Sequence, residues 1–238
     1  MDVFRRRELK FLITQQQRHD LQRLLEEKMV PDKHGRSTIC NLYYDTSDYR
    51  LIRRSIEKPI YKEKLRLRSY GRIEPGVDVF LEMKKKYKGI VYKRRIRVTQ
   101  DQAMAFMERR GDLPEDTQIA RELYYFRDFY KDLEPRVYLS YEREAWYDPQ
   151  DSGFRMTLDQ NIRYRTTELD LTQSYDGQSL LSPELSLLEV KASGGIPMWL
   201  TEHLSAQKIH KQSFSKYGTA YMELLEQRLS ESRGRSYA

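Results

Sequence analysis

The sequence predicts an α+β fold in which about eight strands close into a β-barrel around a polar interior. Three observations predict this fold: a repeated charged triplet, strands with cations on one face, and strand patterns that alternate with helical ones. Each triplet has an acidic residue, one spacer and a basic residue. Side chains alternate between the two faces of a strand, so both charged members of a triplet share a face. The triplets are Glu8-Leu9-Lys10, Glu82-Met83-Lys84 and Glu189-Val190-Lys191.

Other segments place only cations on one strand face. Residues 61–70 put Lys62, Lys64, Arg66 and Arg68 on the same side, and a later segment does so with Lys93, Arg95 and Arg97. Such a face repels itself unless it holds an anion, because like charges about 6 Å apart cost about 3 kcal/mol at an effective dielectric constant near 20.

The first elements follow from alternation and from a capping residue. Residues 4–13 alternate apolar and charged side chains and predict a strand. Thr14 then caps a helix at 15–28 whose apolar stripe faces inward. A turn at 31–35 and a strand at 37–44 follow, and the sequence Asp45-Thr46-Ser47-Asp48 opens a short helical stretch.

The middle of the chain predicts a group of strands followed by helices. Alternation predicts strands at 60–70, 77–87 and 90–98, the last two joined by a hairpin turn at Lys88-Gly89. Helical patterns follow at 100–109 and 117–131.

The last part of the chain returns to strands. We expect strands at 136–147, at 154–158 with 161–165, and at 186–192. Helices are predicted at 197–204 and 215–229. We expect a single domain at 1–228, followed by a flexible tail at 229–238.

Composition limits the function classes. The 238 residues include 43 Lys plus Arg and 36 Asp plus Glu, which gives a net charge of +7 and favours an anionic partner. The single Cys40 excludes an internal disulfide and suits a reducing compartment. There is no apolar run typical of a signal peptide, and no stretch approaches the roughly 20 apolar residues of a membrane span. We therefore expect a soluble, cytoplasmic protein.

Nine short motifs occur in an order known from one family: RELKF, YYDT, KLRLR, FLEMK, YKRRI, YEREAW, FRMTLD, LLEVK and FSKY. In this order the chain resembles the polyphosphate polymerase domain of the vacuolar transporter chaperone (VTC) complex, over about residues 5–222. That domain belongs to the CYTH-like proteins, also called triphosphate tunnel metalloenzymes. The resemblance implies an eight-stranded antiparallel tunnel that holds ATP, triphosphate and polyphosphate, and transfer of the γ-phosphate of ATP to a growing polyphosphate chain.

The resemblance also implies roles for individual residues. The implied phosphate contacts are Lys10, Arg66, Arg68, Lys84, Lys93, Arg95, Arg143, Arg155, Ser215 and Lys216. Lys10, Arg66, Arg68, Lys84 and Lys191 are implied in catalysis. Glu189 resembles the ligand of a Mn²⁺ or Mg²⁺ ion, and Glu8 and Glu82 are further candidates. Arg6 stands where the triphosphatase branch has a first-strand glutamate, which favours the polymerase branch.

Several alternatives stay open. A charged strand face can be a solvated surface with cross-strand ion pairs, and Glu82 can be an ion-pair partner rather than a metal ligand. Asp159 is expected to end a strand and cap a turn, Ser215-Lys216 can be a simple helix cap, and Tyr43-Tyr44-Asp45-Thr46 is expected to be structural. Other functions are a triphosphatase, or a sensor that binds polyphosphate without turnover. No nucleic-acid ligand is expected, and a membrane-protein partner is left open.

Overall fold

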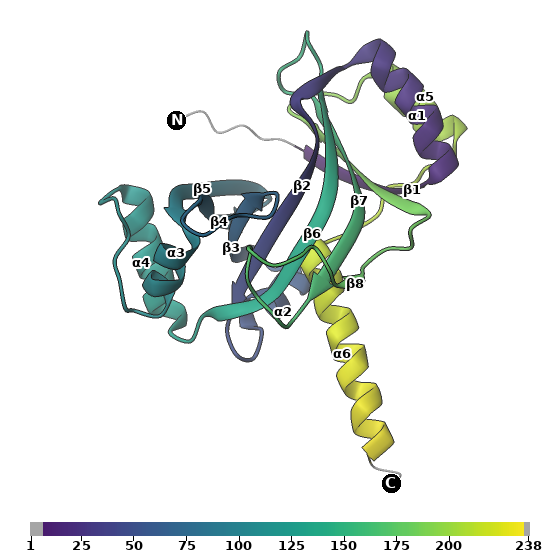
Figure 1. Cartoon of the computed structure of the whole chain (residues 1–238). Helices are drawn as coiled ribbons and strands as arrows, with labels where there is room; N and C mark the ends of the chain where they lie inside the picture. The colour runs from purple at the N-terminus through teal and green to yellow at the C-terminus, as the bar shows by residue number, and fades with distance from the viewer. Residues whose placement is uncertain (1–6, 236–238) are drawn as a thin grey trace. The chain divides into compact units, whose positions relative to one another are not determined.

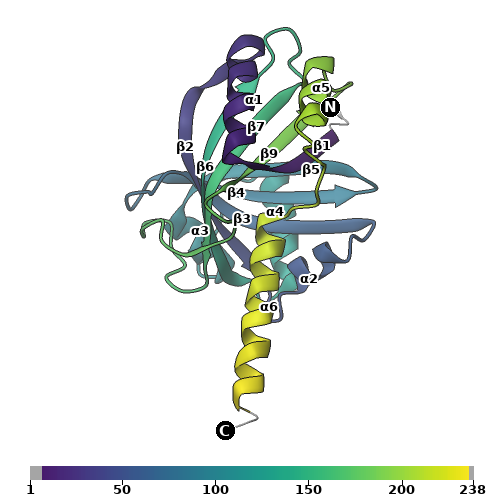
Figure 2. The ribbon, with the colours of Figure 1, turned by 90° about the vertical axis from the view of Figure 1, so that its right-hand side faces the viewer.

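The computed structural model describes residues 7–235, and the side chains only as far as residue 232. Arg6 and the predicted start of the first strand lie outside this range. The described chain is an α+β fold with a large antiparallel sheet (Figures 1 and 2). The strands are β1 (Arg7–Thr14), β2 (Val30–Asp45), β3 (Tyr61–Tyr70), β4 (Asp78–Tyr87), β5 (Ile90–Thr99), β6 (Glu134–Tyr147), β7 (Arg155–Arg165), β8 (Gln178–Ser179) and β9 (Leu185–Ala192). The helices are α1 (Gln15–Lys28), α2 (Arg50–Ile56), α3 (Gln100–Met107), α4 (Gln118–Tyr130), α5 (Met198–Ala206) and α6 (Lys216–Arg235).

The strands follow the order β1-β9-β7-β6-β2-β3-β4-β5, and β8 pairs with β7. A barrel requires hydrogen bonds between its first and last strands. Within residues 7–235 the order ends at β1 and β5, so the sheet is open and the expected closed barrel is not confirmed. No described helix combines the length and the apolar composition needed to cross a membrane.

The chain divides into two compact units, to which β2, β6 and β7 each contribute a part. Unit 1 comprises the chain to Ile39, Ser140–Arg163 and Leu181–Phe214. Unit 2 comprises Cys40–Leu139, Tyr164–Leu180 and the chain from Ser215. The prediction of a single domain at 1–228 stays a prediction.

Unit 1 has two helices on one face of its strands. Leu21 and Leu25 of α1 and Leu200 of α5 pack against apolar residues of β1, β7 and β9, such as Phe11 and Val190. Thr14 caps α1 as expected, because its hydroxyl accepts from the Gln17 backbone N–H while the Gln17 side chain accepts from the Thr14 N–H. This packing leaves the alternate residues of these strands on the opposite face.

Unit 2 contains the antiparallel strands β3, β4 and β5, with α3 and α4 on one face (Figure 1). Leu65, Leu81 and Met83 point to that face and form a core with Phe106 of α3 and Phe126 of α4. The other face of the three strands carries most of their charged residues, whereas Glu63, Lys85 and Arg94 contact α4.

Asp45, the last residue of β2, links that strand to α2 and α6 in unit 2. Its buried carboxylate accepts from the backbone N–H groups of Leu51 (2.8 Å) and Ile52 (3.0 Å) in α2, and from the Tyr217 hydroxyl of α6 (2.8 Å). The expected structural role of Tyr43-Tyr44-Asp45-Thr46 as a strand end and capped turn is therefore confirmed for Asp45.

Three element predictions were wrong, and one short strand was not predicted. Residues 31–35 lie within β2, where Gly35 adopts a φ of +54° that glycine tolerates, rather than in a turn. β7 is one strand, and Asp159 lies inside it instead of at its end. The short β8 was not anticipated, and α6 continues to Arg235, beyond its predicted end at residue 229.

Candidate functional site

In unit 1, pairing register assembles a charged strand face. β1 pairs with β9 so that Lys10 lies opposite Glu189 and Glu8 opposite Lys191. β7 pairs with the other edge of β9 and places Arg155 opposite Lys191. Since the intervening residues pack under α1 and α5, these charged residues all lie on the face away from the two helices.

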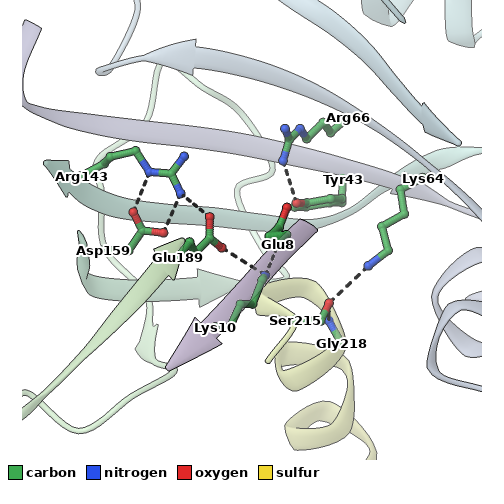
Figure 3. A network of polar contacts seen from close by, with 10 residues as sticks. All are labelled: Glu8, Lys10, Tyr43, Lys64, Arg66, Arg143, Asp159, Glu189, Ser215 and Gly218. Carbon is green, nitrogen blue, oxygen red and sulfur yellow. Dashed lines mark hydrogen bonds and ion pairs between the residues drawn. The ribbon is translucent and has the colours of Figure 1, made fainter. Parts of the chain in front are cut away.

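Lys10 joins two carboxylates on this face. Its Nζ lies 3.3 Å from Glu8 Oε1 and 3.1 Å from Glu189 Oε1 (Figure 3). A single cation position is thus bordered by carboxylates from two strands, β1 and β9.

Arg143 of β6 extends the cluster on the other side of Glu189. Its Nε and Nη2 donate to the two carboxylate oxygens of Asp159 at 2.6 and 2.7 Å, and Nη2 also donates to Glu189 Oε2 at 3.1 Å (Figure 3). Burial alone lowers the pKa of Arg143, but Asp159 and Glu189 outweigh it and raise that pKa well above its ordinary value. Arg143 therefore stays charged, and we call Glu8, Lys10, Arg143, Asp159 and Glu189 the carboxylate cluster.

Two predicted site residues of unit 1 lie beside the carboxylate cluster. Lys191 is half-buried in β9. Arg155 forms an ion pair with Asp32 of β2. Arg155 is therefore engaged by a carboxylate that was not among the predicted site residues.

In unit 2, register aligns cations across three strands. Lys64 of β3 lies opposite Lys84 of β4, which lies opposite Lys93 of β5. In the neighbouring row, Arg66 lies opposite Glu82, and Glu82 opposite Arg95. We call Lys64, Arg66, Arg68, Glu82, Lys84, Lys93 and Arg95 the cation ladder.

Glu82 is the buried centre of the cation ladder. Only 1% of its side chain is exposed. Its carboxylate accepts from Arg66 Nη2 at 2.7 Å, and it forms ion pairs with Lys93, whose Nζ lies 2.6 Å from Glu82 Oε1, and with Arg68 Nε at 3.8 Å. Burial raises the pKa of Glu82, but the charges of Arg66, Arg68 and Lys93 outweigh it and lower that pKa to about 2. Glu82 thus forms ion pairs with Arg66 and Lys93, and a metal role for Glu82 stays a prediction.

This arrangement predicts the behaviour of Glu82→Gln. A carboxyl group whose pKa is lower in the folded state stabilises the fold above its unfolded pKa and loses that contribution as the pH falls. We expect the variant to lose about 3 kcal/mol of unfolding free energy at pH 7, and the difference from wild type to shrink between about pH 5 and pH 2. Urea unfolding across this range measures it. Glu144→Gln, which breaks a partly exposed pair with Arg18, serves as control and should cost less than about 1 kcal/mol. A difference for Glu82→Gln that does not change with pH would contradict the assignment.

Two β2 side chains hold two arginines of the cation ladder, Arg66 and Arg68. Arg66 Nη1 donates to the Tyr43 hydroxyl at 3.0 Å (Figure 3), and Arg68 Nε donates to Asn41 Oδ1 at 3.0 Å. Asn41 was not among the predicted residues, and Tyr43 was expected to be structural only. Alternation along β2 could have found them, because Asn41 and Tyr43 share a face opposite the apolar Cys40 and Leu42.

The start of α6 also contacts the cation ladder. Ser215 Oγ accepts from the Gly218 backbone N–H at 3.2 Å, as a helix cap does, and from Lys64 Nζ at 3.2 Å (Figure 3). Lys216 is half-buried in the first turn. The cap alternative for Ser215 is therefore confirmed, and its contact with a phosphate stays a prediction.

The structure distributes the predicted residues in two groups. The carboxylate cluster of unit 1 includes Glu8, Lys10, Arg143 and Glu189, and adds Asp159, which the sequence analysis placed at a strand end. Asp159 could have been found from alternation with Arg155 and Thr157 along β7. Within residues 7–235, no group of three or more His, Cys, Asp or Glu side chains is arranged to hold a metal ion.

Comparisons with known proteins give a family and a fold. The sequence model of the VTC domain matches residues 5–225. No curated protein matches the chain. A solved structure of a candidate adenylate cyclase from Bacillus halodurans is similar, with 16% identity, a TM-score of 0.53, and coverage of 87% of this chain and 92% of that one. A candidate adenylate cyclase from Vibrio parahaemolyticus has 13% identity and a TM-score of 0.49, with coverage of 91% and 97%.

Proposed function

This chain belongs to the VTC domain family, and we propose that it is a metal-dependent polyphosphate polymerase that transfers the γ-phosphate of ATP to a growing polyphosphate chain in a basic tunnel. The match to the VTC domain model agrees with the resemblance to CYTH-like, triphosphate tunnel proteins that the sequence motifs indicate. The single observation that carries the proposal is the cation ladder, in which Lys64, Lys84 and Lys93 stand side by side on adjacent strands.

The electrostatics of the cation ladder favour a polyanion. Directly opposite side chains on paired strands have Cβ atoms about 5 Å apart, and like charges in such positions destabilise the sheet. Glu82 is the ladder's single carboxylate, and it is already bonded to Arg66 and Lys93. A chain of phosphates supplies closely spaced negative charges that match such a row of cations.

The residue types suit phosphoryl transfer. This reaction needs the protein mainly to position the reactants and to neutralise developing charge. Arginines bind phosphate oxygens through paired donors in a fixed plane, whereas lysines act as mobile point charges. Arg66 and Arg68 are held in place by Tyr43 and Asn41, which reduces the ordering needed when phosphate binds.

The carboxylate cluster fits the divalent ion that the family generally requires. The Lys10 ammonium lies between oxygens of Glu8 and Glu189 and stands where a cation is favoured. With Lys10 turned toward phosphate, Glu8 and Glu189 would hold Mn²⁺ or Mg²⁺, whose remaining ligands would be phosphate oxygens and water. The ion would supply charge neutralisation at the transferred group. Arg143 keeps Glu189 oriented through its contact at 3.1 Å.

Arg6 supports synthesis over hydrolysis. It replaces a carboxylate that the related triphosphatases carry on the first strand, so one acidic group that could activate water is lost. The cytoplasmic location, the absence of nucleic acid among the ligands and the tunnel itself stay predictions.

Incubation of the full chain with ATP and Mn²⁺ tests the proposal. We expect long polyphosphate chains and ADP, resolved by gel electrophoresis, and no chains when the metal is removed by a chelator. Inorganic phosphate with ADP and no chains would identify a triphosphatase instead. Tight binding of polyphosphate without turnover would identify a sensor.

Triphosphate binding should also stabilise the fold. At a ligand concentration about 100 times Kd the gain is about 2.7 kcal/mol, which corresponds to a rise in Tm of about 5–10 °C. Arg66→Ala should lose most of this rise in a thermal-shift measurement with triphosphate and Mn²⁺. The matched control is Arg121→Ala on α4, since Arg121 is exposed and pairs with exposed Asp116. Equal shifts in both variants would contradict a role for Arg66.

A further inference from the structure

Two short segments of unit 2, residues 56–62 and 85–92, form a surface that the proposed reaction does not use. They belong to the α2–β3 connection and to the β4–β5 hairpin. The Lys88 backbone N–H donates to the Ile60 carbonyl at 3.0 Å, and Tyr61 lies opposite Tyr87 in the strand pairing. We call this surface the basic tip.

The basic tip exposes apolar side chains to an unusual degree. It holds six of the fifteen large apolar side chains that are exposed in the described part of the chain. Ile60 is 69% exposed, Tyr87 46% and Val91 43%. The six are Ile56, Ile60, Tyr61, Tyr87, Val91 and Tyr92. Apolar area gathered in one place marks a surface that leaves water when it binds.

The same surface is strongly cationic. Its lysines are Lys58, Lys62, Lys85, Lys86 and Lys88, against the single acidic residue Glu57. Lys85 pairs with Glu122 of α4, while no carboxylate of the described residues forms an ion pair with Lys58, Lys86 or Lys88. Burial lowers the pKa of Lys62, and the charges of Lys86 and Lys58 lower it further, so the cations of the two segments lie close enough to repel one another.

We propose that the basic tip docks the protein onto the surface of an anionic lipid bilayer. Tyrosine rings and aliphatic side chains enter the interfacial region, while lysines contact the anionic headgroups. Charge complementarity selects this occupant. The aliphatic side chains of Ile60 and Val91 can neither donate hydrogen bonds to a phosphate chain nor stack on bases. Lysine is depleted at protein–protein interfaces. The inference does not depend on the polymerase activity.

Vesicle flotation with the full chain tests the docking surface. We expect binding to phosphatidylcholine vesicles that contain about 30% phosphatidylserine, little binding to pure phosphatidylcholine, and weakening by salt. Lys58→Asn with Lys88→Asn should reduce the partition coefficient about tenfold or more. Asn is chosen because both positions have positive φ, 55° and 46°, which Asn tolerates.

A second variant isolates the apolar part. Ile60→Ser with Val91→Ser should reduce partitioning about tenfold while leaving the charge unchanged. The controls are Lys33→Asn with Lys211→Asn, and Leu229→Ser, which alter exposed residues elsewhere and should bind like wild type. Circular dichroism checks that each variant is folded.

Three outcomes would overturn the proposal. The first is no binding to the anionic vesicles at about 0.1 M salt. The second is equal partitioning of the tip variants and the controls. The third is a pair of results: the Lys58 and Lys88 variant binds polyphosphate more weakly, and the Ile60 and Val91 variant floats like wild type. Together these results would identify the basic tip as a phosphate-binding surface. Polyphosphate synthesis is assayed without vesicles, and vesicle binding is assayed without ATP. Failure of the docking proposal therefore leaves the proposed reaction intact, and failure of the proposed reaction leaves the docking proposal intact.

Discussion

Polyphosphate synthesis by the Glu189→Gln variant is expected to fall by about 100-fold or more, which is the scale of losing one electrostatic group of a catalytic centre. Gln keeps the shape of the side chain but removes the charge that faces Lys10 at 3.1 Å and Arg143 at 3.1 Å. A neutral amide binds Mn²⁺ or Mg²⁺ more weakly than a carboxylate does. The rate of chain synthesis from ATP, measured over a Mn²⁺ titration, should show both a lower maximum and a weaker metal dependence.

A matched carboxylate on the opposite strand face provides the control. Glu144 of β6 pairs with Arg18 of α1 at 2.8 Å, whereas its neighbour Arg143 belongs to the carboxylate cluster on the other face of the strand. Glu144→Gln should therefore leave synthesis within about twofold of wild type, since it breaks only a partly exposed pair. If Glu189→Gln retains both the wild-type rate and the wild-type Mn²⁺ dependence, the metal does not bind at Glu189. Folding of both variants is checked by their Tm.

Arg143→Ala is expected to destabilise the protein by about 3–5 kcal/mol, because removing one partner of a buried ion pair leaves a charge uncompensated. Asp159 has a fully buried side chain and receives both of its Arg143 hydrogen bonds at 2.6–2.7 Å, and Glu189 is 8% exposed. Guanidinium chloride unfolding measures the loss.

Arg143→Lys separates charge from geometry. Lys keeps the positive charge but cannot donate in parallel to both oxygens of Asp159. We expect a loss between that of the alanine variant and wild type. A loss below about 1 kcal/mol for Arg143→Ala, the range of exposed pairs, would contradict the assignment of Arg143 as the charge that stabilises the buried carboxylates.

Much of the local structure was predictable because its causes are local. The β3, β4 and β5 predictions differ from the observed bounds by one residue at most at each end, since apolar and charged residues alternate over most of each strand, with exceptions such as Glu63 and Arg94. Thr14 was expected as a cap from its place before a helical pattern, and its capping box is present. The turn at 31–35 failed because Pro31 and Gly35, which usually mark turns, lie within the long strand β2.

The candidate site was predictable only in part. Glu142 and Glu144 lie on the strand face opposite Arg143, as alternation along one strand requires, and they pair there with Arg36 and Arg18. The partner of Arg143 was missed, because Asp159 was expected to end a strand. It pairs with Arg143 from inside β7, and only the continuity of that strand through Asn161 reveals this.

By itself, the sequence determined which side chains share a strand face, that the faces carry an excess of cations, and which family the motifs belong to. Only the tertiary structure decided which charges meet. Glu82 receives Arg66 and Lys93 from the two strands next to it in the chain, and Glu189 receives Lys10 and Arg143 from strands that are distant in the chain. The physical reason is that alternation is a property of one strand, whereas register and strand order come from the packing of the whole apolar core.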